Sequence, residues 1–458
     1  MPRSFPILRH CAALLFLLAA STCVAQLNIS SVQSGPMVGY SDMTEVLLWV
    51  QTTKKASVQF RYWTEADPKK KSSTDPVITG KENAFVARVR IEELVPGTRY
   101  GYEVMVDGKL ITRPYPLRFQ TQTLWQWRTD PPAFTAAVGS CFYINETAWD
   151  RPGKPYGSDY GIAGTIAAQE PDLMIWLGDN TYYREVDWNS VSGLKRRWTH
   201  TRSQRELQPL LGSVHNYYIW DDHDFGPDDS DRSYRLRTEA LDVFKLFTAN
   251  QTYGTLETPG IFSRFEWADA EFILLDDRFH RSPNRTSEGP DKTMWGTEQV
   301  QWLKDAFLNS RSPFKIVLNG NQVLNPICPY EGLIEFRSEY DDLLGFIRAN
   351  RITGVVFVSG DRHMSELIKL EDSTFYPLYD FTSSSLTAGL APPRGAEVNN
   401  PYRVPGSLVA DAHNFGLLKF TGPRTDRVLT IECRDTVGTL RWSHKIRASD
   451  LRPPALAR

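Results

Sequence analysis

Residues 173–183 read Leu-Met-Ile-Trp-Leu-Gly-Asp-Asn-Thr-Tyr-Tyr, an unbroken apolar run that passes directly into glycine, acidic and tyrosine residues. A run of five apolar residues without alternation is typical of a strand buried on both faces of an α/β sheet. In open sheets of this kind, ligands bind at the carboxyl ends of the strands. The stretch therefore predicts an α/β domain in which polar side chains follow buried strands.

The same arrangement recurs five more times along the chain, with helical patterns in between. Largely apolar runs occupy residues 134–138, 217–220, 271–275, 315–318 and 355–358. The segments that follow these runs are Gly139-Ser140-Cys141, Asp221-Asp222-His223-Asp224, Asp276-Asp277-Arg278, Asn319-Gly320-Asn321-Gln322 and Gly360-Asp361-Arg362-His363. We therefore expect six strands to bring Cys, Asp, Tyr, His, Asn and Arg side chains to one edge of the fold.

Several carboxylates at one edge indicate a metal site. If Asp179, Asp222 and Asp361 share a pocket, their joint ionisation is unfavourable unless cations compensate the charge. Oxygen ligands from Asp and Asn suit Ca²⁺ or Mg²⁺, whereas thiolate, imidazole and phenolate suit Fe³⁺ or Zn²⁺. Taken singly, an aspartate after a strand is more often a turn residue than a metal ligand, a cysteine more often a buried thiol, and a histidine more often structural. Their recurrence after successive buried runs is what favours a two-metal centre.

Residues 27–123 show a different pattern, in which short β-rich segments alternate with turns. This spacing predicts a β-sandwich, and the turn at residues 94–102 resembles that of fibronectin type III and other immunoglobulin-like domains. No cluster of ligating side chains occurs there, so we expect a packing module. A polar stretch around residues 120–132 is the predicted linker to a catalytic domain over residues 133–448. The overall fold class expected is α/β (α+β).

Composition and the first residues bear on location and partners. The formal net charge is −2, which gives no electrostatic basis for a nucleic-acid partner. Residues 1–25 match a cleaved signal peptide, so we expect a secreted or periplasmic protein, with a lipoprotein anchor at Cys23 as the weaker alternative. No later run is apolar for long enough to cross a membrane. Three further cysteines, Cys141, Cys328 and Cys433, do not form a disulfide framework, although a single bridge stays open.

Four motifs carry a resemblance to a known family: Gly139-Ser140-Cys141, Gly178-Asp179-Asn180-Thr181-Tyr182, Trp220-Asp221-Asp222-His223-Asp224 and Gly360-Asp361-Arg362-His363. Their order and spacing resemble the alkaline phosphatase D (PhoD-like) family of the calcineurin-like and purple acid phosphatase superfamily. The resemblance covers almost the whole mature chain. It implies an immunoglobulin- or fibronectin-III-like β-sandwich followed by a four-layer αββα metallophosphoesterase domain.

The resemblance also implies roles for individual residues. It implies that Fe³⁺ is bound by Cys141, Tyr182 and His363. Asp179 would bridge this ion to a second metal ion, which is Ca²⁺ in the family. The further ligands of the second ion would be Asp222, Asp361 and Asn321. His223 would face the leaving group and Arg278 would hold the phosphate. Asp221 and Asp224 stay open as alternatives to Asp222, and Asn319 as an alternative to Asn321. Because no twin-arginine pair is present, Zn²⁺ or Mn²⁺ also stays open.

The expected activity is hydrolysis of small-molecule phosphomonoesters by attack of a metal-bound hydroxide, as in an alkaline phosphatase. One alternative keeps the metals but changes the substrate, giving a phosphodiesterase or phospholipase D-like activity. Another is a secreted binding protein with a vestigial catalytic domain, against which the intact ligand set argues. The segment 382–405, rich in Ser, Gly and Pro, is expected to form a long loop near the site. The sequence makes no prediction of the oligomeric state.

Overall fold

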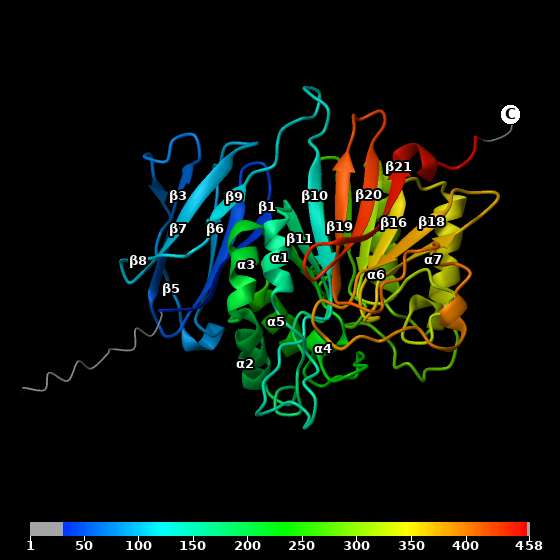
Figure 1. Ribbon diagram of the computed structural model, residues 1–458, viewed down its shortest axis with the longest axis horizontal. Coiled ribbons are helices and arrows are strands. Elements are labelled where there is room, and N and C mark those ends of the chain that lie inside the picture. Colours follow the sequence, from blue (N-terminus) through cyan, green and yellow to red (C-terminus); the bar gives the residue numbers. More distant parts are fainter. Residues whose placement is uncertain (1–30, 456–458) are drawn as a thin grey trace, which may run out of the picture. The chain divides into compact units, whose positions relative to one another are not determined.

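The computed structural model describes residues 31–455, and three β-sheets dominate this part of the chain (Figure 1). The predicted signal peptide and Cys23 lie outside the described residues. Within residues 31–455, no helix has the length and apolarity that a membrane crossing requires.

The first sheet has nine strands and contains three of the predicted buried runs. Its order is β21 (Leu440–Arg447), β20 (Val428–Asp435), β19 (Asn414–Thr421), β10 (Phe134–Gly139), β11 (Leu173–Leu177), β12 (His215–Ile219), β1 (Val32–Ser41), β2 (Val46–Thr52) and β6 (Val86–Ile91). Strands β10, β11 and β12 are parallel neighbours. Their carboxyl ends therefore meet at one edge of the sheet.

The second sheet contains the other three runs. Its order is β13 (Ser263–Trp267), β14 (Ala270–Leu274), β15 (Phe314–Asn319), β16 (Val355–Ser359), β18 (Leu378–Thr382) and β17 (Glu366–Leu370). Strands β14, β15, β16 and β18 run parallel. The predicted strands over residues 271–275, 315–318 and 355–358 are thus confirmed as neighbours in one sheet.

Helices connect the parallel strands, because such neighbours need a crossover connection that usually contains a helix. Helix α1 (Ile162–Ala168) links β10 to β11, and α2 (Val191–Arg202) and α3 (Gln208–Ser213) link β11 to β12. In the second sheet, α6 (Thr297–Asn309) links β14 to β15, and α7 (Arg337–Ala349) links β15 to β16. The remaining helices are α4 (Asp222–Phe225), α5 (Arg237–Phe247), η1 (Lys81–Asn83), η2 (Arg205–Leu207), η3 (Leu333–Glu335), η4 (Gly395–Asn399) and η5 (Ala448–Leu451).

Aromatic side chains join the two large sheets. The ring of Phe134 on β10 lies 6.3 Å from Phe272 on β14, and Phe420 on β19 lies 6.0 Å from Phe272 and 5.8 Å from Phe314 on β15. These residues belong to one continuous buried core. Two sheets that share a core, with helices in their crossover connections, confirm the predicted α/β fold class with its paired central sheets.

The third sheet builds the N-terminal sandwich. Its order is β4 (Ser72–Ser73), β3 (Ser57–Thr64), β7 (Arg99–Val106) and β8 (Lys109–Ile111), with β5 (Val77–Ile78) beside β3 and β9 (Arg118–Gln120) beside β7. Its inner face shares a separate core with β1, β2 and β6. Strand β1 also pairs in parallel with β12, with Val38 opposite His215. One layer of the sandwich is therefore continuous with the nine-stranded sheet, which the sequence did not predict.

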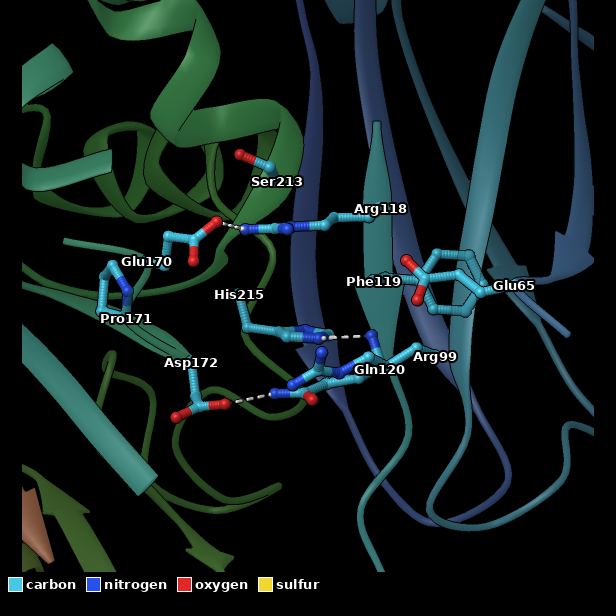
Figure 2. A pocket seen from close by; sticks show the side chains of 10 residues that line it. All are labelled: Glu65, Arg99, Arg118, Phe119, Gln120, Glu170, Pro171, Asp172, Ser213 and His215. Carbon is cyan, nitrogen blue, oxygen red and sulfur yellow. Dashed lines mark hydrogen bonds and ion pairs between the residues drawn. The ribbon is translucent and has the colours of Figure 1, made fainter. Parts of the chain in front are cut away.

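Polar contacts tie β9 to the segment before β11 and to β12 (Figure 2). They surround a small cavity of about 110 Å³. The side chain of Gln120 donates to Asp172 (2.7 Å), and Arg118 pairs with Glu170 (3.0 Å). The backbone N–H of Gln120 donates to Nε2 of the buried His215 (3.1 Å). These contacts fix the sandwich against the sheet that carries the site.

Candidate metal centre

The predicted ligands lie in tight turns directly after the strands. Cys141, Asp179, Asp361 and His363 have φ values of 61°, 53°, 64° and 53°. This left-handed region costs a residue other than glycine about 1–3 kcal/mol, and it persists only where the surrounding structure enforces it. Such conformations cluster at functional sites, so their recurrence at strand ends points to the same edge as the sequence motifs.

One cluster brings together four of the predicted ligands. Ligand atoms of Cys141, Asp179 and His363 lie within 4.8 Å of one another. The hydroxyl of Tyr182 is 2.8 Å from Oδ2 of Asp179 and 3.4 Å from Nε2 of His363. Sγ of Cys141 is 3.6 Å from the same Oδ2. Thiol, imidazole, phenol and carboxylate thus converge on one point, as a site for Fe³⁺ or Zn²⁺ requires.

Neighbouring groups orient two of these ligands. The hydroxyls of Ser384 and Ser140 lie 3.1 and 3.3 Å from Sγ of Cys141. Burial raises the pKa of the Cys141 thiol to about 11, and these two hydroxyls offset only part of that effect. Nδ1 of His363 is 2.6 Å from the carbonyl oxygen of Gly389, which leaves Nε2 to face the cluster. The thiolate needed for ligation would therefore form only with a cation present.

A second cluster shares Asp179 with the first. Ligand atoms of Asp179, Asp222 and His223 lie within 4.8 Å of one another, and so do those of Asp222, Asp229 and Glu331. Asp179 therefore stands between the two clusters, in the position that a bridging carboxylate would occupy. The carboxylates of Asp222, Asp229 and Glu331 lie next to it, and oxygen ligands of this kind suit a hard cation such as Ca²⁺.

The electrostatics of the site fit a bound cation. Burial, together with the neighbouring Cys141 and Asp222, raises the pKa of Asp179 well above its usual range. Burial also raises the pKa of Asp361 to about 6. Arg362 offsets only part of the shift at Asp361, and a multivalent metal ion would relieve the shifts at both aspartates. The residues present thus fit the two metal ions that the family resemblance implies.

The structure distinguishes the three adjacent aspartates. Asp221 and Asp224 cap the short helix α4, where Oδ1 of Asp224 accepts from the backbone N–H of Asp221 (2.7 Å). Oδ2 of Asp224 also accepts from the backbone N–H of Asn180 (3.0 Å). Only Asp222 faces the cavity with the ligand clusters. Of the alternatives left open by the sequence, the geometry favours Asp222.

Arg278 and Asn321 are placed differently from the prediction. Both are fully buried and neither lines the cavity. Nε of Arg278 donates to Asp221 (2.6 Å) and Nη2 to Glu331 (2.8 Å). Oδ1 of Asn321 accepts from Arg278 (3.3 Å) and from Arg281 (3.1 Å). Carboxylates from other loops thus engage the Arg278 guanidinium, which suits a positioning role better than contact with phosphate.

The alternative Asn319 is also engaged elsewhere. Its Oδ1 accepts from the indole N–H of Trp295 at 2.9 Å, and its amide group donates to the carbonyl oxygen of Asn321 at 2.8 Å. A role of Asn321 or Asn319 as a metal ligand stays a prediction. Beside Asp222 stand Asp229 and Glu331, two carboxylates that were not predicted from the sequence.

A cavity of about 340 Å³ opens over the two clusters. Its lining combines predicted site residues with residues from loops, namely Tyr156, Asp179, Asp222, His223, Asp228, Asp229, Tyr330, Glu331, Asp361, Arg362, His363, Ala391, Pro392, Arg394 and Glu397. The predicted loop over residues 382–405 supplies four of these. Arg362 is part of a predicted motif and Asp229 follows another within a few residues, so the sequence held a signal for both. Tyr156, Tyr330 and Glu331 lie in loops without any recognisable pattern.

Comparison with known proteins agrees with this geometry. A model of the family described as PhoD-like phosphatase matches residues 140–422, more than half of the chain. The chain belongs to the PhoD-like phosphatase family. This confirms the resemblance predicted from the four motifs. A model described as Domain of unknown function (DUF7800) matches residues 29–124, the region of the sandwich.

Solved structures support the same fold. A structure titled "Structure of PhoD" superposes with a TM-score of 0.76 at 17% identity, covering 94% of this chain and 93% of that one. The purple acid phosphatase PPD1 from yellow lupin (Lupinus luteus) seeds gives a TM-score of 0.65 at 14% identity, covering 93% and 78%. Alkaline phosphatase D of Bacillus subtilis (strain 168) is 21% identical over 369 residues. That match spans 66% of this chain and 61% of the length of the relative.

The three cysteines after the predicted signal peptide are free and buried, so the alternative of a single disulfide is wrong. Cys328 lies beside the site, where Nη1 of Arg362 donates to its Sγ (3.0 Å). Nη2 of Arg362 donates to Glu397 (3.0 Å). This arginine therefore ties two loops of the cavity wall to the turn that carries Asp361 and His363.

Proposed function

We propose that this chain is a secreted, metal-dependent phosphatase that hydrolyses small phosphomonoesters. The observation that carries the proposal is the convergence of Cys141, Asp179, Tyr182 and His363, next to a cavity that Asp179, Asp222 and His363 line. Membership of the PhoD-like phosphatase family supports it. The signal-peptide pattern of residues 1–25 supports a location outside the inner membrane.

The proposed cofactors are two metal ions, Fe³⁺ at the Cys141 cluster and Ca²⁺ at the Asp222 cluster, with Zn²⁺ or Mn²⁺ as alternatives. When bound, such a pair of ions lowers the pKa of water, polarises a phosphoryl oxygen and neutralises charge on the leaving group. Asp179 would hold the two ions in a fixed relation, because it belongs to both clusters. Asp361, at the cavity wall, is the further proposed ligand.

His223 is the proposed proton donor to the leaving group. Its side chain is partly exposed in the cavity, with Nε2 3.4 Å from Oδ1 of Asp228 and 4.0 Å from Oδ2 of Asp222. Burial lowers the pKa of His223, whereas these carboxylates act in the opposite direction. A histidine so placed can pass a proton to a departing alkoxide, and Asp222 and Asp228 favour its protonated form against the effect of burial.

Anionic substrate oxygens would meet cationic side chains at the opposite wall. Arg362 and Arg394 line the cavity, and Arg394 is exposed at its rim. Glu397 and Cys328 hold Arg362 in place. We assign phosphate contact to Arg362 and Arg394. Arg278 instead orients Asp221 and Glu331.

The test compares hydrolysis of an aryl phosphomonoester with that of the matching diester, before and after chelation and with Ca²⁺ restored. Elemental analysis of the purified protein identifies the bound metals. Fast monoester turnover that chelation abolishes is the expected result. Faster turnover of the diester would replace the monoesterase assignment with phosphodiesterase activity. Metal-loaded protein that hydrolyses neither ester would refute the enzymatic proposal and favour a binding protein.

A further inference from the structure

Tyr156 stands at the mouth of the cavity, in the connection between β10 and α1, and 47% of it is exposed. Its hydroxyl oxygen is 3.1 Å from Nδ1 of His363. Its ring makes a T-shaped contact with Tyr143 at 4.9 Å. On another side, Gly389 approaches so closely that an added Cβ would lie 2.8 Å from Cε2 of Tyr156. These contacts hold the ring against the cavity wall.

The hydrogen bonds around His363 determine what the Tyr156 hydroxyl can do. Nδ1 of His363 lies 2.6 Å from the carbonyl oxygen of Gly389, so Nδ1 carries the ring proton, because two bare acceptors would repel at this distance. Tyr156 can therefore only accept from Nδ1. Across residues 31–455, no other hydrogen-bond partner of this hydroxyl is found. Its own O–H is thus available to a ligand in the cavity.

We propose that Tyr156 is a catalytic residue that donates a hydrogen bond to a phosphoryl oxygen of the substrate. The inference rests on the proposed phosphatase function and adds a neutral donor to it. Tyr156 lines the same cavity as Asp179, Asp222 and His363, so its hydroxyl can reach a phosphoryl group bound in that cavity. A phenol keeps its proton at neutral pH, since its ordinary pKa is about 10.

A neutral donor suits this position. The cavity wall is mainly acidic, with Asp179, Asp222, Asp228, Asp229, Glu331, Asp361 and Glu397 among its residues. A further carboxylate would repel the phosphoryl oxygens, and a further arginine would compete with bound metal ions for the acidic ligands. A phenolic O–H adds a directed hydrogen bond without changing the charge of the site.

The test uses the full-length, metal-loaded protein with Tyr156→Phe. This variant keeps the ring and its contacts and removes only the hydroxyl. The matched control is Tyr160→Phe in the same connection, whose hydroxyl accepts from the backbone N–H of Asn145 (2.9 Å) and which does not line the cavity. Three quantities are measured for each protein: metal content, the Kd for inorganic phosphate by calorimetry, and kcat/KM for an aryl phosphate.

We expect Tyr156→Phe to retain its metals and to bind inorganic phosphate about tenfold more weakly, because a hydrogen bond to a charged acceptor is lost. The control should match the wild type in all three quantities. Tyr156→Phe could instead lose metal while its metal-loaded fraction binds phosphate with unchanged affinity. That result would mean that Tyr156 only positions His363, and it would overturn the inference. Unchanged phosphate affinity beside an active wild type would also overturn it, while leaving the proposed function intact. A wild type that neither binds phosphate nor turns over the ester would overturn both.

Discussion

Acidification from pH 7 to about pH 4 should destabilise this protein through His215, at the junction between the sandwich and the nine-stranded sheet (Figure 2). The imidazole is buried, its Nδ1 lies 2.9 Å from the carbonyl oxygen of Gly39, and its Nε2 accepts from the backbone N–H of Gln120. That pattern requires the neutral ring with the proton on Nδ1. Protonation of Nε2 would break the bond to Gln120.

The magnitude follows from the shift in pKa. Burial lowers the pKa of His215 from 6.5 to about 4 in the folded protein. Between these two values, the unfolded chain binds a proton that the folded chain does not bind, so stability falls as the pH falls through this window. Each pKa unit corresponds to about 1.4 kcal/mol, which makes the full loss about 3 kcal/mol at the acid end.

Other charged side chains line the same small cavity as His215, and their titration could also change stability with pH. Glu65, Arg99, Arg118, Glu170 and Asp172 line it together with His215. Acidic and basic side chains are mixed there, and burial is the leading cause of the shift. A variant that changes only the imidazole therefore isolates its contribution from theirs.

The assay is denaturant unfolding of the wild type and of His215→Gln at steps between pH 7 and pH 4. Glutamine can donate to Gly39 and accept from Gln120 without titrating. We expect the difference in unfolding free energy between the two proteins to shift by about 3 kcal/mol in favour of the variant as the pH falls. Contributions from all other titrating groups are common to both proteins. Parallel pH curves for the two proteins would refute the argument.

Three further substitutions test the site. Asp179→Ala should abolish phosphoester turnover without lowering the melting temperature of the metal-free protein, because it removes a buried carboxyl whose pKa is raised; retained turnover would exclude the bridging role. Cys141→Ser should reduce the content of one metal and leave the other bound, as elemental analysis would detect; unchanged content of both would make Cys141 a packing residue. Arg278→Met should lower the unfolding free energy by about 3–5 kcal/mol, because it leaves the buried carboxylates of Asp221 and Glu331 without this partner. An unfolding free energy equal to that of the wild type would contradict the ion-pair assignment.

Much of the fold and site could be read from local sequence. A strand buried on both faces must be apolar throughout, so runs such as residues 173–177 and 355–358 identify themselves without knowledge of their neighbours. The turn after each strand carries its side chain to the same edge, because parallel strands share their direction. For that reason the cluster of Cys141, Asp179, Tyr182 and His363 was predictable as a set.

Roles that depend on side-chain direction were not predictable in this way. Arg278 follows a strand just as Asp222 does, yet its guanidinium turns into the interior, where Asp221 and the loop residue Glu331 bind it. Which of two adjacent polar residues faces the cavity depends on partners from other segments. The same reason explains why Oδ1 of Asn321 accepts from two arginines, Arg278 and Arg281.

Local sequence is sufficient to predict the buried strands, their polar termini and an N-terminal sandwich, because burial and turn formation impose residue types locally. Contacts between distant segments are needed to establish that β1 joins β12, that Glu331 and Asp229 enter the site, and that Tyr156 lies against His363. Each of these contacts joins segments far apart in the chain. These contacts form only when the two sheets pack together and bring their loops to one edge, and no local sequence pattern predicts that arrangement.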